Sequence, residues 1–279
     1  MDTLDGYTLE DLLICRMARE MKGEAIAGAA TYCSNVAVKL AQALHNPDLI
    51  DFSSGLHHFD SRTPATILLS EYVGKATRKA RMSWEELFAM IFRQQFLIWV
   101  GPAQIDQNGN ANISVIGRWE DPKVAMVGAR GLPDDSVHVK AMNYHVLDHS
   151  KRSFVSRVDF VCAVGFGDAR KNAGIKDGEP GIVVSNLGVF DFDAASGRMR
   201  IQSLHPGVSL DEVRQNTGFE LMVPSEIPRT ALPTKEEIDL IPTLDPLGLR
   251  FLDRMPRAKA GSYLTQVLQR ERELFKAYA

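Results

Sequence analysis

The first hundred residues alternate between amphipathic segments with helical spacing and short apolar segments typical of strands. Leucines and methionines recur on one helical face in residues 8–22, and valines, leucines and alanines do so in residues 34–45. The segments 24–28 and 49–53 follow these two stretches and are apolar enough for buried strands. A repeated strand–helix–strand order predicts a parallel sheet with helices packed on its faces.

A third helix and strand continue the alternation. Ser83 and Glu86 form a capping box ahead of a helical apolar face that includes Trp84 and Leu87. The uninterrupted apolar run FLIWV at residues 96–100 then favours a central strand that is buried on both faces.

Beyond Gly101, short strand-like runs predominate. QNGN at residues 107–110 is a turn signal, and the runs after it are ANISVIG, VAMVG, AMNYHVL, VDFVCAV, GIVVSN, GVFDF and RMRIQSL. Because no long helices separate these runs, we predict an α/β fold with an open mixed, largely parallel sheet that is flanked by helices.

The C-terminal residues differ in composition from the rest of the chain. Residues 221–279 are rich in proline and include a capping box at Thr234 and Glu237, and a final helix is expected around residues 264–278. We therefore expect one α/β domain over residues 1–220 and a wrapping tail over residues 221–279. The apolar face of that tail needs a partner, either this chain's own sheet or a second subunit.

Composition excludes several classes of protein. Of the 279 residues, 45% are hydrophobic and 24% charged, as in globular domains, and the net charge of -3 leaves no broad basic surface for nucleic acid. The FLIWV run is far shorter than the roughly 20 residues of a membrane helix, and the acidic N-terminal stretch does not resemble a signal peptide. Three cysteines without CxxC spacing argue against a disulfide framework and a zinc site. We expect a cytoplasmic protein that binds no metal, nucleic acid or membrane.

Two glycine-bearing turns after expected strands are candidate ligand contacts, SSG at residues 53–55 and GARG at residues 128–131. Glycine at the carboxyl end of a strand lets main-chain N–H groups approach a ligand oxygen. A purely structural role accounts for either turn equally well.

Other candidate sites are weaker. GFGDAR at residues 165–170 begins like a dinucleotide-binding loop, but Arg170 stands where a small residue is needed and no clear helix follows, so we reject that function. Adjacent side chains such as His57 and His58 rarely share one metal ion. His149 is either a ligand contact or a structural neighbour of a solvated Lys–Arg pair, Lys151 and Arg152.

Seven groups of motifs follow one another along the chain: SSGL, GPAQIDQNGNANIS, GARG, HSKRSFVSRVDFV, VVSNLGVFDF, HPGVSLDEVRQNTGF, and the closing LPT with DPLGLR. In this order they resemble the β subunit of heteromeric family I CoA-transferases, of the glutaconate CoA-transferase type. GARG, VVSNLGVFDF, SLHPGV and LPT are more similar to the branch of CoA hydrolases that cleave steroid rings. The resemblance implies the NagB/RpiA-like fold of the CoA-transferases.

One residue departs from the transferase pattern. In transferases that the motifs resemble, a glutamate directly before Ser–Gly attacks the acyl-CoA thioester and carries CoA as a covalent thioester. This chain has Ser53 at that position. A serine hydroxyl is protonated at neutral pH and needs an adjacent base, for which His57 and His58 are weak candidates. We interpret Ser53 as a residue that does not act as a nucleophile, in a pocket that still holds a CoA thioester.

The resemblance therefore implies a β subunit that hydrolytically cleaves a ring carbon–carbon bond of a cyclic keto acyl-CoA from steroid (cholesterol) degradation. Activity would require an α subunit that supplies the general base, in a heterodimer or heterotetramer. Arg130 would face a carboxylate or a developing negative charge, and the main chain near Ser54 and Gly55 would face a carbonyl oxygen. No cofactor is expected apart from the CoA of the substrate.

Gln104, Gly128, Gly131 and His149 complete the expected substrate contacts. For Gln104 the alternative to a substrate contact is a hydrogen bond that fixes the conformation of the turn. Neighbouring Asp and Asn side chains in the same turn are interpreted as structural, because they commonly bond nearby backbone groups.

Two other functions stay open. The chain could belong to an active CoA-transferase that moves CoA between carboxylic acids, with a nucleophile that is displaced or supplied by the partner. Alternatively, it is a non-catalytic scaffold subunit that completes the partner's acyl-CoA pocket.

Overall fold

A computed structural model describes the chain over residues 6–52, 58–67, 77–93, 96–176, 178–274 and 276. Three of the candidate site residues, Ser53, Ser54 and Gly55, lie outside these ranges, as does His57. The other candidates lie within the ranges, together with the elements that flank residues 53–57.

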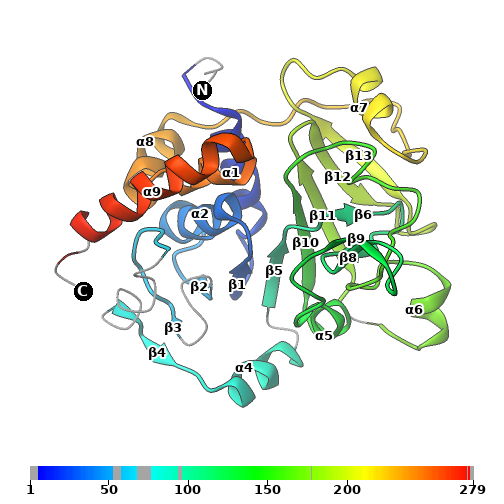
Figure 1. The fold of residues 1–279 in the computed structure, drawn as a ribbon, viewed down its shortest axis with the longest axis horizontal. Coiled ribbons are helices and arrows are strands. Elements are labelled where there is room, and N and C mark those ends of the chain that lie inside the picture. Colours follow the sequence, from blue (N-terminus) through cyan, green and yellow to red (C-terminus); the bar gives the residue numbers. More distant parts are fainter. Residues whose placement is uncertain are drawn as a thin grey trace. The chain divides into compact units, whose positions relative to one another are not determined.

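The chain divides into two compact units, whose elements are labelled in Figure 1. Unit 1 comprises Met1–Met90 and Ala231–Ala279, and unit 2 comprises Ile91–Thr230. The C-terminal residues thus share a unit with the N-terminal ones. The expected division into a 1–220 domain and a 221–279 tail stays a prediction.

Unit 1 consists mainly of helices. Its elements are α1 (Leu9–Glu20), β1 (Ile26–Ala29), α2 (Tyr32–Leu40), the π-helical turn η1 (Ala41–His45), β2 (Ile50–Asp51), β3 (His58–Phe59), β4 (Ala80–Arg81), α4 (Trp84–Ile91, which ends at the unit boundary), α8 (Lys235–Leu244), the 3-10 helix η2 (Leu249–Arg254) and α9 (Arg257–Leu274). β1 and β2 pair in parallel, whereas β3 and β4 pair antiparallel. Helices α1, α2 and α8 pack on one another.

Side chains just before the helices fix where they begin. The Ser83 hydroxyl accepts the backbone N–H of Glu86 and the Glu86 carboxylate accepts that of Ser83 ahead of α4, and Thr234 and Glu237 form the same capping box at α8. Both capping boxes are expected from the sequence and are confirmed.

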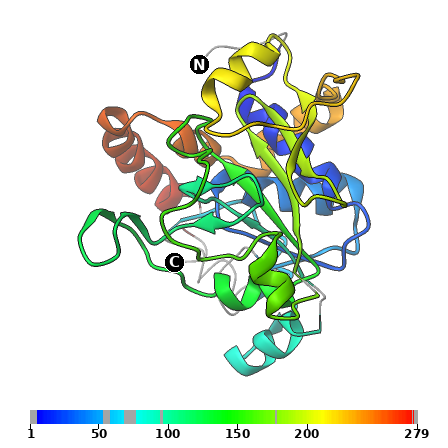
Figure 2. The ribbon, with the colours of Figure 1, turned by 90° about the vertical axis from the view of Figure 1, so that its right-hand side faces the viewer.

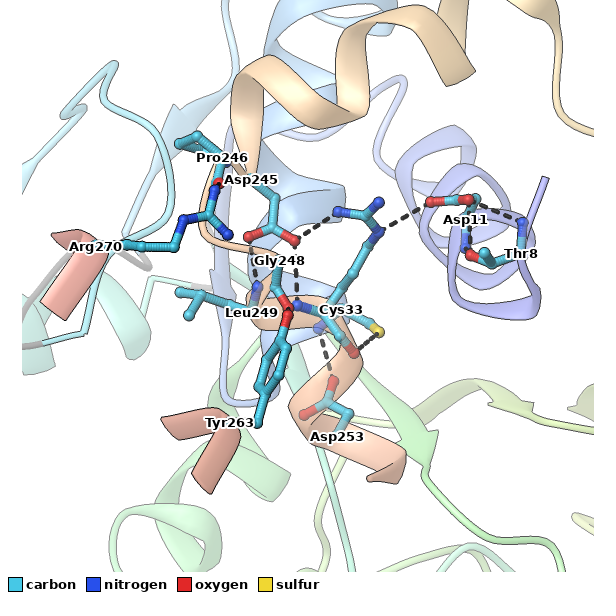
Figure 3. Close-up of polar contacts among 11 residues, drawn as sticks. Thr8, Asp11, Cys33, Asp245, Pro246, Gly248, Leu249, Asp253, Tyr263 and Arg270 are labelled. Atoms are coloured by element: carbon cyan, nitrogen blue, oxygen red, sulfur yellow. Dashed lines mark hydrogen bonds and ion pairs between the residues drawn. The ribbon is translucent and has the colours of Figure 1, made fainter. Parts of the chain in front are cut away.

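The closing DPLGLR segment and the residues directly after it are held to the N-terminal helices by buried polar contacts (Figure 3). Arg250 lies 2.9 Å from Asp245 and 3.0 Å from Asp11 of α1. Asp253 accepts the backbone N–H of Cys33 at 2.7 Å, at the N-terminus of α2. These contacts give the C-terminal motif a structural role in unit 1.

Unit 2 contains the main β structure. Its elements are β5 (Phe96–Val100), β6 (Gln104–Ile105), β7 (Ala111–Asn112), β8 (Val115–Gly117), β9 (Pro122–Ala125), α5 (Leu132–His138), β10 (Ala141–Val146), α6 (Asp168–Asn172), β11 (Pro180–Ser185), β12 (Gly188–Phe192), β13 (Met199–Leu204) and α7 (Leu210–Asn216). Five strands lie side by side in the order β5, β10, β11, β12, β13. β10 is parallel to β5 and β11, and β12 is antiparallel to β11 and β13. The sheet is therefore mixed, as expected.

The core of unit 2 forms where large rings meet on these strands. Trp99 of β5, Tyr144 of β10 and Phe190 of β12 are fully buried, as is Phe154 from the loop after β10. The FLIWV strand, β5, is buried along most of its length, as expected.

The conformation of the QNGN turn requires the glycine and the Asx side chains that the sequence has there. Gly109 has φ +81°, and a Cβ atom there would lie 2.8 Å from the ring of Phe192. Asp106 accepts the backbone N–H groups of Asn108 and Asn110. The structural role expected for these Asx side chains is confirmed.

Several local expectations are wrong. The VAMVG run contributes only Val124 and Ala125 to β9, and β9 pairs within the described residues with β8 in a separate two-stranded sheet instead of extending the main sheet. ANISVIG is divided between β7 and β8, which also lie outside the main sheet, and VDFVCAV forms no strand but only an isolated bridge at Ala163. A short helix, α6, does follow GFGD. Arg170 of that helix donates to the carbonyl oxygens of Ser136 and Val164, which gives its side chain a structural role, and the rejection of a dinucleotide site stays a prediction.

Candidate functional site

A pocket of about 690 Å³ opens at the carboxyl ends of two parallel strands of unit 2. Its floor follows directly after β5, at residues 101–104, and after β10, at residues 146–148 and 150–153. Ligands of open α/β sheets bind at this edge, because successive strands end there and their loops diverge. Two motifs that carry the family resemblance, GPAQ and HSKRSFV, thus line one pocket.

The pocket lining combines apolar residues with two cations and one acid, Asp148. Ile116 and Val124 from the β8–β9 hairpin line it together with Val146 and contribute apolar surface. Lys151 and Arg152 line the same pocket and are exposed, and neither forms an ion pair within the described residues. Such a pocket suits an amphiphile that combines an apolar body with carboxylate or phosphate groups.

Gln104 lies at the base of this pocket with its amide fully engaged. Its Nε2 donates to the carboxylate of Asp159 at 3.0 Å. Its Oε1 accepts the side-chain amide of Asn112 at 2.8 Å and the backbone N–H of Asp159 at 3.0 Å. The residue is only 5% exposed. The turn-fixing role is therefore confirmed, and a direct ligand contact by Gln104 stays a prediction.

The GARG loop is strained and carries an unpaired cation. Gly128 has φ +84°, a value that suits glycine, but Arg130 has φ +53°, which costs free energy for a residue with a Cβ atom. Arg130 is exposed and makes no hydrogen bond or ion pair within the described residues. Strained backbone of this kind concentrates at functional sites. The loop follows β9 of the hairpin, not a strand of the main sheet as the sequence suggested.

A carboxyl group with a raised pKa lies beside this loop. Asp135, in the first turn of α5, has an oxygen 3.3 Å from the position that a Cβ atom on Gly131 would occupy. Burial, together with the neighbouring Asp134 carboxylate, raises the pKa of Asp135 to about 7. No sequence pattern signals this, because acidic residues are ordinary in the first turn of a helix.

His149 is buried in the core of unit 2 and does not line the pocket. Its Nδ1 lies 2.9 Å from the Ser185 hydroxyl and its Nε2 lies 2.9 Å from the Thr217 hydroxyl. The ring stacks on Phe154 at 3.6 Å, and burial lowers the pKa of His149 to about 3. A neutral ring with both nitrogens engaged has a structural role. Contact between His149 and substrate stays a prediction.

The elements that flank residues 53–57 are tightly fixed. Asp51, at the end of β2, is fully buried and pairs with Lys39 of α2 at 3.0 Å. The backbone N–H of Phe52 donates to Ala27, and that of Asp60 donates to Asp51. Ser53, Ser54 and Gly55 lie between these residues in the sequence, and their expected roles stay predictions.

Sequence reasoning misses part of the pocket. In the sequence, Lys151 and Arg152 are interpreted as a solvated pair, although both line the pocket. No pattern in the sequence distinguishes Asp159, although its carboxylate accepts a hydrogen bond from Gln104. The described residues contain no group of three or more His, Cys, Asp or Glu side chains placed to hold a metal ion. None of the described helices is both long enough and apolar enough to cross a membrane.

Comparison with known proteins places these motifs in a family. The sequence profile described as Coenzyme A transferase matches residues 61–216, more than half of the chain. The chain belongs to the coenzyme A transferase family. Within this family, the cholesterol ring-cleaving hydrolase IpdB subunit of Mycobacterium tuberculosis (strain ATCC 25618 / H37Rv) is 34% identical to it over 236 residues. The match covers 82% of this chain and 90% of the relative.

Two further members of the family extend the comparison. The β subunit of the glutaconate CoA-transferase of Acidaminococcus fermentans is 26% identical, with 84% of this chain and 93% of the relative covered. The crystal structure of Rhodococcus jostii RHA1 IpdAB matches with a TM-score of 0.77 and 30% identity, covering 89% of this chain and 99% of that chain. The resemblance to glutaconate-type β subunits and to the ring-cleaving branch is confirmed, and with it the CoA-transferase fold.

Proposed function

We propose that this chain is the β subunit of a two-subunit enzyme that hydrolytically cleaves a ring carbon–carbon bond of a cyclic keto acyl-CoA from steroid degradation. The observation that carries the proposal is Ser53, which occupies the position of the glutamate expected in transferases. The 34% identity to a cholesterol ring-cleaving hydrolase subunit supports the same choice. Without an ionised nucleophile at that position, the chain keeps a thioester pocket and lacks the means to carry CoA covalently.

The reaction needs a base, an oxyanion site and an electron sink. A base removes a proton from water as its oxygen bonds to the ring ketone carbon. Collapse of the resulting oxyanion breaks the carbon–carbon bond, leaves a carboxylic acid and releases a carbanion. The thioester beside this carbon delocalises the pair as an enolate, which then takes up a proton.

The residues of this chain supply binding and charge stabilisation in the proposal. Arg130 carries an exposed guanidinium, unpaired within the described residues, that neutralises a carboxylate or the developing oxyanion. The apolar wall beside Ile116 and Val124 holds the ring remnant, and Lys151 and Arg152 meet anionic groups of the substrate. Main-chain N–H groups near Ser54 and Gly55 bond the carbonyl oxygen.

In this proposal the general base comes from an α subunit, as the resemblance to the ring-cleaving branch implies. His149 is neutral with both nitrogens engaged. The relatives support a partner, since both named sequence relatives are subunits of larger enzymes. The enzyme requires no metal or separate cofactor, and it acts in the cytoplasm, where acyl-CoA substrates and free thiols such as the three buried cysteines are found.

Reconstitution with the α subunit tests the proposal. The complex should open a cyclic keto acyl-CoA by hydrolysis and show no exchange of labelled CoA between carboxylic acids. Ser53→Ala should keep turnover within a few-fold, whereas loss of a true nucleophile costs on the order of 10³-fold or more. Mass spectrometry after hydroxylamine or borohydride treatment should find this chain unmodified.

The second candidate is a CoA-transferase, favoured by the 26% identity to a glutaconate CoA-transferase subunit. CoA exchange at rates comparable to turnover, or a trapped thioester on a carboxylate of either subunit, would establish that function and remove the hydrolytic one.

A further inference from the structure

Asp60 of unit 1 combines burial, charge and backbone strain. Its φ angle is +54°, in the left-handed region, and Arg130 is the other non-glycine residue with a positive φ in the described part of the chain. Asp60 is only 5% exposed. Such a conformation costs free energy and persists where surrounding contacts determine it, most often at functional sites. The contacts of this residue indicate what the strained conformation secures.

Side chains from separate segments converge on the Asp60 carboxylate. Gln42 donates from Nε2 to Oδ1 at 2.6 Å. The Nε of Arg62 lies 3.3 Å from Oδ1, and the Nζ of Lys79 lies 2.5 Å from Oδ2. Gln42 is buried and belongs to η1, which directly continues α2, and both are blue in Figure 2. The carboxylate therefore connects the α2–η1 helix to the chain that follows β3.

The backbone of Asp60 closes a loop. Its N–H donates to the carbonyl oxygen of Asp51, the last residue of β2, at 2.9 Å. Inside this closure the rings of Phe52 and Phe59 lie with their centroids 5.4 Å apart. The residues on either side of the segment 53–57 in the sequence thus contact each other at the carboxyl end of β2. Ligands of α/β sheets bind at this end of the strands.

One helix holds both ends of this loop. Lys39 of α2 pairs with the fully buried Asp51 carboxylate at 3.0 Å, before the segment 53–57. Gln42, three residues after Lys39, holds Asp60 beyond it. Helical residues three apart lie on the same face, so these two contacts come from one side of the α2–η1 helix. Separating a buried ion pair is costly, and the α2–η1 helix therefore fixes where the loop begins and ends.

We propose that Asp60 is a positioning residue for the reaction, which holds the ends of the segment 53–57 against the α2–η1 helix. This inference rests on the proposed function, in which main-chain N–H groups near Ser54 and Gly55 bond the carbonyl oxygen. Such donors stabilise an oxyanion well only when they are fixed in place before the reaction. Asp60 then acts on the transition state through the main chain, without contact with the substrate.

Kinetics of the complex reconstituted with the α subunit test this role. Asp60→Ala should lower kcat by at least about 30-fold, because displacing catalytic groups by about 1 Å can cost 10²-fold. KM for acyl-CoA should stay within about three-fold, since the pocket residues that bind the substrate are unaltered. Asp60→Asn keeps an acceptor for Gln42, and asparagine tolerates a positive φ, so kcat should recover to within about five-fold of the unaltered enzyme.

Asp11→Ala is the matched control for lost stability. Asp11 is also a buried carboxylate of unit 1, and it accepts the backbone N–H of Thr8 at 2.9 Å and lies 3.0 Å from Arg250. At a temperature where both variants are fully folded, Asp11→Ala should keep kcat within about two-fold of the unaltered enzyme. An equal fall in kcat in both variants would give Asp60 a merely structural role and overturn the proposal.

Amide hydrogen exchange of the same complexes measures the closure directly. Asp60→Ala should raise the exchange rate at Phe52 and at position 60 by about ten-fold or more, because both N–H groups are hydrogen-bonded at the ends of the loop. Asp60→Asn and Asp11→Ala should leave these two rates nearly unchanged. Unchanged exchange in Asp60→Ala overturns the proposal.

The outcomes separate this inference from the function on which it rests. If the unaltered complex does not cleave a cyclic keto acyl-CoA, the proposed function is wrong and the positioning role falls with it. If the unaltered complex is active and Asp60→Ala keeps its kcat, the proposed function stands and the positioning role alone is wrong. Faster exchange without a loss of kcat leads to the same conclusion.

Discussion

Two neighbouring segments of unit 2 both belong to the family motifs, yet they treat their polar groups in opposite ways. The turn at residues 101–114 pairs each polar atom of Gln104 with Asn112 or Asp159 and buries them. The GARG loop leaves Arg130 exposed, without a partner in the described residues, and in a left-handed conformation. A family motif can therefore be scaffold or site. Satisfied hydrogen bonds point to the first, and strain with an unpaired charge points to the second.

Arg130→Ala is the strongest test of this contrast. We expect kcat/KM of the reconstituted enzyme to fall by about 10²–10³-fold, or about 3–4 kcal/mol of transition-state stabilisation, because the developing negative charge loses its cation. The free energy of unfolding should change by less than about 0.5 kcal/mol, since Arg130 loses no partner among the described residues and alanine shares the cost of the positive φ. Steady-state kinetics and urea denaturation measure the two quantities.

Arg130→Lys is the companion variant. Lysine keeps the charge but not the planar fork of donors, so activity should recover only in part. Unchanged turnover in Arg130→Ala, with assembly intact, would instead make this chain a non-catalytic scaffold.

Gln104→Ala should show the reverse pattern. The substitution leaves one N–H of the buried Asn112 amide and the backbone N–H of Asp159 without an acceptor, so we expect a loss of about 2 kcal/mol in unfolding free energy. Gln107→Ala, in the same turn, has no such side-chain partners in the described residues and should cost less than about 0.5 kcal/mol. Urea denaturation compares the two. If Gln104→Ala keeps its stability but raises KM, the residue contacts substrate after all.

Asp135 allows a pH test at the edge of the strained loop. Burial raises the pKa of this carboxyl to about 7, well above its unfolded value, so the folded state binds the extra proton between roughly pH 4 and pH 7. Its contribution to stability is therefore present at low pH and is lost as the pH rises through 7.

Asp135→Asn removes this ionisation. The variant should gain stability relative to the unaltered chain as the pH rises from 4 to 7, and no further above pH 8. Thermal denaturation across that range measures the difference. Asp121→Asn serves as the control, because Asp121 is exposed and does not contribute to the raised pKa of Asp135. A constant difference at all pH values would show that the carboxyl of Asp135 is ionised throughout.

Local patterns explain why much of the fold is predictable. The Ser83–Glu86 capping box and the FLIWV strand depend on neighbouring residues and on burial, and both lie where the sequence places them. VAMVG misleads the prediction, because an apolar run has the same composition in a central strand and in a hairpin that stands outside the sheet.

The candidate site is less predictable because its features arise from tertiary contacts. Val124 reaches the loop that carries Lys151 only after the hairpin folds back, which no local pattern records. The left-handed conformation of Arg130 is equally invisible, because arginine rarely adopts it. His149 lies in a family motif of charged residues but turns into the core, where Ser185 and Thr217 bind it.

Lys151 and Arg152 provide the smallest expected effect and refine the contrast between scaffold and site. Like Arg130 they form no ion pair within the described residues, and they are exposed residues of the pocket lining, so that water screens their charge. Lys151→Ala and Arg152→Ala should each raise KM for acyl-CoA by about 3–5-fold and leave kcat nearly unchanged, because they bind substrate and transition state alike. The KM increase should shrink between about 50 and about 300 mM salt. If either substitution instead lowers kcat by an amount that does not depend on salt, the substituted residue acts on the transition state, as we expect of Arg130.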